Sequence, residues 1–476
     1  MSRLFTFHSI QDYHKALQDG TASCEEAVLY YLRAIEQQQQ LNAFTTVYGE
    51  EALAKARSLD ERRKTGQPMG KLHGVVIGLK AVIAWKDYPL TAASNILRNY
   101  TSLYNATVVD KMLGEEAILI GHLNCDEFAM GSSNENSAFG NVLNARNKDR
   151  VPGGSSGGSA VAVQAGLCML SLGSDTGGSV RQPADFCGIL GLKPTYGRVS
   201  RYGLIAYASS FDQIGIFGGN VRDVALLLEV IAGEDDYDST VKQEAAPSWT
   251  ENPDRKYRIA YFKEALDHPG LDPEIRCAIL ERTRQWREAG HTVEAIDFEL
   301  LDYIVPAYYV LTTAEASSNL ARYDGVRYGH RSPDPQLELT EFYKRNRSEG
   351  FGREVKRRIL LGTFVLSAGY YDAYFTKAQQ VRQLVVERTN LIFKDFDIII
   401  LPTAPTTAWR IGEKTDDPIS MYLADIYTVY ANLTGIPGIS LPLFGHTNGM
   451  PFGMQAMTSR FNELSLLQFS HQMMQQ

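Results

Sequence analysis

Residues 151–191 contain an unusually dense run of glycine and serine, with an apolar segment at 160–172 between two glycine-framed serine clusters. The clusters are GGSSGGS at 153–159 and DTGGS at 175–179. Glycine loses more backbone freedom on folding than any other residue, so ordered structure retains it where the backbone is unusual or closely approached. A flexible linker has no use for a buried apolar segment. The run therefore predicts a functional site rather than a linker.

Two common uses of such a run find little support in the residues. Glycine-rich turns before helices bind phosphate, but the patterns GxxxxGK[ST] and GxGxxG are both absent from the sequence. The GxSxG pattern of many Ser-His-Asp hydrolases can be placed on the first cluster, but such a site also needs a histidine. The nearest histidines, His122 and His268, lie in segments with no other catalytic signal.

A serine activated by lysine is a third interpretation. A desolvated lysine can remove the serine proton, because burial disfavours the ammonium form and lowers the lysine pKa. Lys80 ends the apolar stretch 75–79, which is where a lysine could be held in a dry site. A lysine at a strand end is more often a solvated charge, so its position alone does not assign it a role.

Composition narrows the classes of protein. The chain has 476 residues, of which 44% are hydrophobic and 21% charged, as in ordinary globular proteins. Its net charge of -8 argues against a broad nucleic-acid-binding face. The five cysteines form no CxxC or Cys/His cluster, so we expect free thiols and no metal site. With no signal-like start and no 18-residue apolar run, the sequence predicts a soluble cytoplasmic protein without membrane contact.

Helical and strand patterns alternate along the chain. Strands are expected at 74–80 and 118–121, and Ser23 with Glu26 has the form of a capping box inside a helical region at 8–39. The alternation predicts an α/β fold, with a mixed central β-sheet covered by helices on both faces. Other expected helices are 50–64, 106–117, 273–290, 305–322 and 353–392, and other expected strands are 257–262, 292–298, 396–401 and 436–442.

No internal repeat and no Pro/Gly/Ser linker divides the sequence. We therefore expect a single domain over residues 1–476, with a largely helical insertion at about 240–395.

Lys80, Ser155 and Ser179 together resemble the Ser-Ser-Lys triad of the amidase signature family, and their spacing along the chain agrees with it. The matching motifs are GGSSGGSA at 153–160, GSDTGGSVRQP at 173–183 and FCGILGLKPTYGRVSRYGL at 186–204. The resemblance implies the amidase signature fold and hydrolysis of an amide. It also implies that Ser179 is the nucleophile, that Ser155 follows a cis peptide bond and relays the proton, and that Lys80 is the base and then the acid.

The resemblance further implies an oxyanion hole made of backbone N–H groups that are free to point at the substrate carbonyl oxygen. Removing one such donor typically costs about 2.7–4 kcal/mol of transition-state stabilisation. The four residues of this hole would be Thr176, Gly177, Gly178 and Ser179.

Within that family, the chain resembles the glutaminase components of tRNA-dependent amidotransferases nearly end to end. The segments that carry this include NCDEFAMGSSNENSAFG at 124–140, SAGYYDAYFTKAQQVR at 367–382 and MYLADIYTVYANLTGIPGISLP at 421–442. The resemblance implies hydrolysis of glutamine to glutamate and ammonia. Arg358 would bind the glutamine α-carboxylate and Asp425 the α-ammonium, with a hydrogen bond from Tyr309, although Tyr308 beside it leaves open which ring faces the ligand.

The same resemblance implies a division of labour. The chain would carry no cofactor, and ATP and Mg would bind a partner in a heterotrimer that also contains the B and C subunits of the amidotransferase. That partner would also hold most of the tRNA, whether Glu-tRNA(Gln), Asp-tRNA(Asn) or both. The absence of a Walker motif and of a basic stretch from the sequence agrees with this.

Three positions depart from the family pattern. Ala81 follows the lysine where the family commonly has Asp, and Val76 and Ile216 stand where proline is frequent. None of them removes a catalytic group, so we expect activity. Two rival interpretations are a free-standing amidase for another amide, which would have little use for Arg358 and Asp425, and an inactive scaffold protein, which the intact Lys80, Ser155 and Ser179 oppose.

Overall fold

The computed structural model describes residues 5–334 and 336–475. Within them, eleven strands form one sheet that contains both parallel and antiparallel neighbours. The predicted mixed sheet is therefore confirmed. In sheet order the strands are β1 (Phe44–Val47), β3 (Ile118–Leu123), β2 (Val76–Lys80), β4 (Leu170–Asp175), β6 (Gln213–Gly218), β5 (Leu190–Lys193), β10 (Gly438–Gly445), β11 (Pro451–Met457), β9 (Ile398–Pro402), β7 (Arg258–Phe262) and β8 (Thr292–Ile296).

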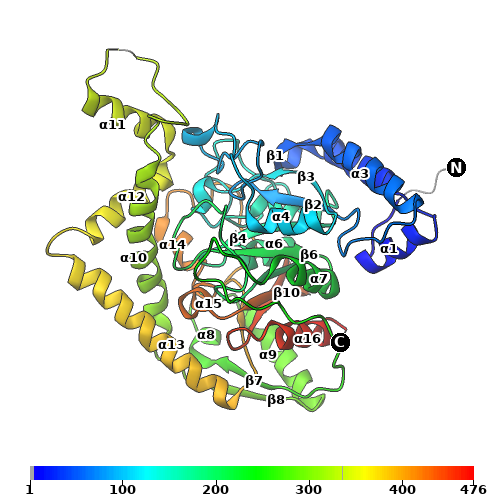
Figure 1. Ribbon diagram of the computed structural model, residues 1–476. Helices are drawn as coiled ribbons and strands as arrows, with labels where there is room; N and C mark the ends of the chain where they lie inside the picture. The colour runs from blue at the N-terminus through cyan, green and yellow to red at the C-terminus, as the bar shows by residue number, and fades with distance from the viewer. Residues whose placement is uncertain (1–4, 335, 476) are drawn as a thin grey trace.

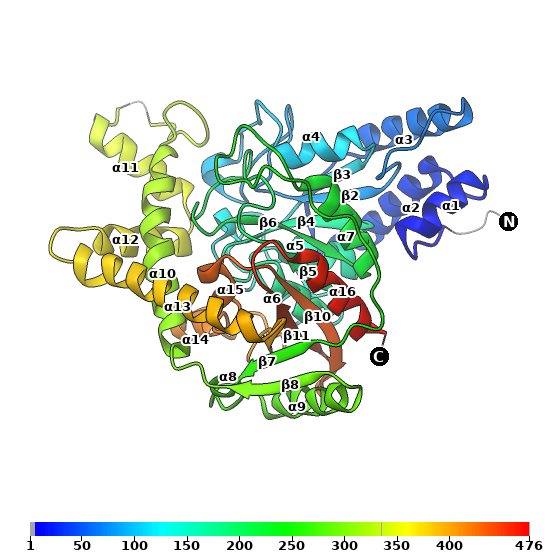
Figure 2. The same ribbon diagram turned by 60° about the horizontal axis from the view of Figure 1, so that its bottom comes forward.

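Both faces of the central part of the sheet are covered. Every residue of β2, β3, β4, β5 and β6 is buried, although neighbouring side chains of a strand point to opposite faces. Figures 1 and 2 show helices packed around these strands. The covering helices include α4 (Thr107–Gly114), α5 (Gly157–Gln164), α6 (Arg181–Cys187), α7 (Val221–Ile231) and α16 (Glu463–Met474).

The first helical region is interrupted where its capping box begins. Ser23 Oγ accepts a hydrogen bond from Glu26 N at 3.1 Å, and Glu26 Oε2 accepts one from Ser23 N at 3.0 Å. This box starts a new helix, so the region predicted at 8–39 consists of two helices. They are α1 (Ile10–Gln18) and α2 (Cys24–Gln37), and α3 (Gly49–Lys64) packs against α2.

The segment predicted as a helical insertion also adds strands β7 and β8 to the edge of the sheet. The helix expected at 353–392 is broken, because Gly369 adopts a left-handed φ of 88° between two helices. The helices of this segment are α8 (Lys263–Leu266), α9 (Pro273–Glu288), α10 (Leu301–Asn319), α11 (Leu339–Gly350), α12 (Arg353–Val365) and α13 (Lys377–Asp395), with a π-helical turn η5 (Asp372–Thr376).

All five cysteines are free thiols, and four of them are buried. Among the described residues, no helix combines the length and the apolar character needed to cross a bilayer. The remaining elements are η1 (Gln39–Leu41), η2 (Asn95–Leu97), η3 (Glu127–Ala129), η4 (Leu320–Arg322), α14 (Pro418–Leu423) and α15 (Val429–Thr434).

Helices α10, α12 and α13 lie at one end of the molecule, away from α1, α2 and α3 at the other (Figures 1 and 2). α10 and α12 cross at very short range, because a Cβ added to Gly362 would overlap the backbone carbonyl of Thr313. No side chain separates the two helix backbones at this point. The position of α12 is therefore fixed directly by α10.

We predict that Gly362→Ala destabilises the protein, because the new methyl group must push α12 away from a backbone atom. The expected loss is about 1–3 kcal/mol, the usual cost of overpacking, and thermal unfolding measures it. Gly114→Ala in α4 is the matched control, since nothing lies within 4 Å of a Cβ added there. Equal melting temperatures for the two variants would contradict the close crossing.

Candidate active site

Lys80 is a fully buried amine at the carboxyl end of β2. Its Nζ donates hydrogen bonds to the hydroxyl oxygens of Ser155 at 2.7 Å, Ser156 at 2.9 Å and Ser174 at 2.9 Å. Burial lowers the pKa of the Lys80 amine to about 8. The lysine is therefore close to the neutral form that a general base requires.

Ser155 lies two residues before α5, after a cis peptide bond from Gly154. Its carbonyl oxygen accepts a hydrogen bond from Asp126 N at 3.0 Å, and Gly154 N donates to Gln182 Oε1 at 2.9 Å. A Cβ on Gly154 would overlap the Asp126 carboxylate. The first glycine cluster thus lets the backbone pass close to a buried carboxylate, with the Ser155 hydroxyl directed at Lys80.

Ser179 lies in the loop that follows β4, next to β2 in the sheet. Asp175 holds this loop, because it accepts hydrogen bonds from Gly178 N at 2.8 Å and Val180 N at 3.1 Å. Burial alone would raise the pKa of Asp175, but its ion pair with buried Arg181 lowers that pKa to about 2. The loop is therefore organised by a carboxylate that stays charged.

Among the four predicted oxyanion-hole donors, the Gly178 N–H is bonded to the buried Asp175 carboxylate in this structure. In the described part of the chain, no hydrogen bond is made by the N–H groups of Thr176, Gly177 and Ser179. These three remain the candidate donors. Ser155 and Ser179 likewise share no hydrogen bond among the described residues, so the relay between them stays a prediction.

The structure brings Tyr309, Arg358 and Asp425 together. Asp425 Oδ2 accepts hydrogen bonds from Tyr309 Oη at 2.9 Å and Ser132 Oγ at 2.8 Å, and burial raises the pKa of Asp425 to about 6. The Arg358 guanidinium lies 5.5 Å from the Tyr309 ring centroid. The Tyr308 hydroxyl lies against the serine loop instead, since a Cβ on Gly177 would overlap it. Tyr309 is the member of the pair that donates a hydrogen bond to Asp425.

This charged group adjoins the serine loop. Thr428, three residues after Asp425, donates from Oγ1 to the carbonyl oxygen of Gly177 at 2.7 Å. Beside Arg358, a pocket of about 40 Å³ is lined by residues that include Gly131, Ser133 and Tyr422. The serine loop, the segment that carries Asp425 and the nearby Arg358 therefore belong to one region of the structure.

Arg358 is held by groups that the sequence did not single out. Its Nε donates to Glu354 Oε1 at 2.8 Å and its Nη1 to Tyr207 Oη at 2.7 Å. Glu354 lies four residues before Arg358, so the two side chains share one face of the helix. This spacing is the sequence signal from which Glu354 could have been predicted. Ser132, Ser156 and Ser174 lay inside the recognised segments but were given no role. Tyr207 was given no role either.

The departures from the family pattern leave this local structure intact. Ala81 donates its N–H to Leu123 O and accepts from Ala92 N, both at 2.9 Å. Val76 and Ile216 are buried strand residues. The backbone on either side of Lys80 is therefore supported without an aspartate at position 81.

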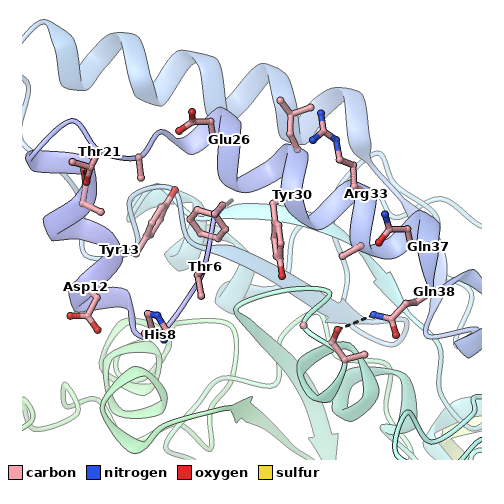
Figure 3. Close-up of a pocket in the computed structure, with 17 residues that line it drawn as sticks. Thr6, His8, Asp12, Tyr13, Thr21, Glu26, Tyr30, Arg33, Gln37 and Gln38 are labelled. Atoms are coloured by element: carbon pink, nitrogen blue, oxygen red, sulfur yellow. Dashed lines mark hydrogen bonds between the residues drawn. The ribbon is translucent and has the colours of Figure 1, made fainter. Parts of the chain in front are cut away.

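A much larger cavity lies elsewhere and contains none of the predicted site residues. It measures about 1040 Å³ and is bounded by α1, α2 and residues 165–166, where Gln38 Nε2 donates to Ala165 O at 3.2 Å (Figure 3). Its lining includes Tyr13, Tyr30 and Arg33 (Figure 3).

Comparison with known proteins identifies the family. The Amidase family model matches residues 26–467. The chain is 50% identical over 466 residues to the A subunit of the glutamyl-tRNA(Gln) amidotransferase from Chlorobium phaeobacteroides, covering 97% of each chain, and 48% identical over 460 residues to its counterpart from Koribacter versatilis, covering 96% of this chain and 95% of the relative.

A solved structure gives the same result as the sequence comparison. The A subunit of the glutamyl-tRNA(Gln) amidotransferase from Thermotoga maritima superposes with a TM-score of 0.78 at 38% identity, covering 94% of this chain and 91% of that one. These matches agree with the motifs around the two serines and the buried lysine, and with the mixed sheet that holds them. The chain belongs to the amidase signature family.

Proposed function

We propose that this chain is the glutaminase subunit of a tRNA-dependent amidotransferase, which hydrolyses glutamine and passes the ammonia to partner subunits. The observation that carries the proposal is the pair of opposite charges, Arg358 and Asp425, joined by Tyr309 beside the Lys80 and Ser179 machinery. An α-amino acid presents one carboxylate and one ammonium, so it fits such a pair. The names of the relatives favour Glu-tRNA(Gln) as the acceptor.

Both charged groups have unused capacity for a ligand. Arg358 has five N–H groups and spends two of them on Glu354 and Tyr207, which leaves three for a carboxylate. Asp425 accepts both of its hydrogen bonds at Oδ2, and within the described residues Oδ1 accepts none. Oδ1 is therefore available for an ammonium.

The reaction follows from the protonation state of Lys80. Neutral Lys80 takes a proton from Ser155, Ser155 takes the Ser179 proton, and Ser179 Oγ bonds to the amide carbon. N–H groups of the serine loop stabilise the oxyanion. Lys80 then returns its proton, through Ser155, to the leaving nitrogen as the C–N bond breaks and ammonia departs. Water hydrolyses the acyl-enzyme in the same way, which releases glutamate and restores Ser179.

An exposed aromatic face supports a role within a complex. Leu360 on α12 is 70% exposed, and the Phe364 ring packs at 4.4 Å from the Tyr370 ring and 5.8 Å from the Tyr374 ring, all three at the surface. Contiguous apolar clusters on a soluble protein mark interaction sites. We propose that this outer aromatic face, Leu360, Phe364, Tyr370 and Tyr374, binds one of the partner subunits, while ATP, Mg and most of the tRNA bind the partners in the cytoplasm.

We predict that Ser179→Ala and Lys80→Met each lower glutamine hydrolysis by more than about 10³-fold, because one removes the nucleophile and the other the titratable amine. The assay co-purifies the chain with its partners and follows glutamine-dependent conversion of Glu-tRNA(Gln), and separately of Asp-tRNA(Asn). With added ammonia, both variants should support the conversion at the unmodified rate. Normal glutamine turnover by Ser179→Ala would rule the mechanism out.

We predict that kcat/KM for glutamine rises with pH and levels off above about 8. The base must be neutral, and the Lys80 amine, with a pKa of about 8, loses its proton as the pH passes that value. Initial rates between pH 6.5 and 9 measure the profile, and circular dichroism at each pH checks that the protein stays folded. A flat profile would contradict Lys80 as the base.

We predict that Leu360→Asp and Phe364→Asp weaken co-purification with the partner subunits, because a charge on the outer aromatic face must be desolvated on binding. Leu103→Asp is the matched control, at a leucine that is 75% exposed outside this face. Hydrolysis of glutamine by the isolated chain should stay unchanged. Retention of the partners by both face variants would exclude this surface as the interface.

A further inference from the structure

Asp212 is a buried carboxylate in the turn before β6, and it holds two separate segments of the chain. Its Oδ1 accepts a hydrogen bond from Thr176 Oγ1 at 2.6 Å. Its Oδ2 accepts from Tyr207 N at 2.9 Å and Ala208 N at 3.0 Å. The pairing of Asp175 with Gln213 in the antiparallel β4–β6 ladder brings Thr176 opposite Asp212.

The two segments serve different halves of the site. Thr176 lies in the nucleophile loop, three residues before Ser179. Tyr207 belongs to the substrate half, because its hydroxyl accepts a hydrogen bond from Arg358 Nη1 at 2.7 Å and its ring centroid lies 5.5 Å from the guanidinium. One side chain therefore connects the backbone that carries the nucleophile with the residue that holds the carboxylate-binding arginine.

The hydrogen bonds of Asp212 require a carboxylate at this position rather than an amide. Three donors point at Asp212, and they are shared between its two oxygens. An asparagine has only one acceptor oxygen, and its NH₂ group would face a donor. Asp212 forms no ion pair with a lysine or arginine in the described ranges, and burial raises its pKa to about 7. Its charge acts to raise the pKa of both the Lys80 amine and the Arg201 guanidinium, and Glu315 in turn raises the pKa of Asp212.

We propose that Asp212 is a positioning residue that fixes the nucleophile loop and Tyr207 relative to each other, so that recognition of the α-carboxylate and placement of Ser179 depend on one group. This rests on the proposed glutamine site. Loosening Asp212 should then disturb both the chemical step and the selection for a carboxylate, whereas loosening either end should disturb only one.

Two substrates separate these effects in the complex of the full chain with its partners. Glutamine carries the α-carboxylate, and 4-aminobutanamide is the same amide without it. The ratio of their kcat/KM values measures carboxylate selection, and kcat measures nucleophile placement. If the wild-type complex does not prefer glutamine, the proposed function itself fails, before any variant is considered.

The variants give distinct patterns. Tyr207→Phe should lower the ratio about tenfold, the effect of losing a hydrogen bond to a charged group, with kcat retained. Thr176→Val should lower kcat on both substrates and keep the ratio, while Thr176→Ser, which retains the hydroxyl that donates to Asp212, should have a higher kcat than Thr176→Val. Asp212→Asn should lower the ratio and kcat together. Asp223→Asn, at another buried carboxylate that accepts backbone and side-chain hydrogen bonds, should change neither.

Two results would overturn the proposal. One is an Asp212→Asn complex that melts at the wild-type temperature with wild-type kcat and ratio. The other is an Asp212→Asn complex that loses stability and activity while its ratio stays wild-type, because that is what a purely structural role predicts. If Asp212→Asn cannot be purified in folded form, Thr176→Val and Thr176→Ser decide, since equal kcat values for this pair would mean that the bond to Asp212 does not position the loop.

Discussion

A buried amine without a carboxylate in contact is the constraint on which this site depends. Removing a charged group from water costs several kcal/mol unless a partner compensates for it. Among the residues that the structure describes, Lys80 has only three hydroxyl groups as hydrogen-bond partners. Hydroxyl groups can donate to a neutral amine as well as accept from an ammonium. The surroundings therefore tolerate both protonation states, which suits a group that must gain and lose a proton in every cycle.

Asp175 and Arg181 satisfy the opposite requirement in the neighbouring serine loop. Their charges are paired, and Arg181 also donates to Thr428 O and to the side-chain oxygens of Gln455 and Asn432. A fully bonded ion pair stays charged and does not move readily. The fixed pair shapes the serine loop, and in the proposed mechanism the adaptable amine performs the chemistry, so the two kinds of buried charge have separate tasks.

Much of the fold and of the site could be predicted from the sequence, because both are local in the chain. The capping box at Ser23, the buried strand ending at Lys80 and the serine motifs are short patterns with direct physical meaning. What was missed depends on backbone conformation and side-chain contacts that residue types alone do not show. The break after α12 comes from the left-handed Gly369, and the Gly178 N–H is taken by Asp175 folded back on the loop. The contact of Tyr207 with Arg358 joins residues 151 positions apart.

The close crossing of α10 and α12 has a consequence for substrate size. Tyr309 is on α10 and Arg358 is on α12. The backbones of the two helices approach each other closely at Gly362, so the position of one helix depends on the other. Asp425 is tied to the serine loop through Thr428 in turn. In the proposed complex, the carboxylate end and the amide end of a bound molecule would thus be held by groups whose separation the fold fixes. In the proposed glutamine site, this fixed separation would select the length of a bound amino acid amide without any residue contacting its methylenes.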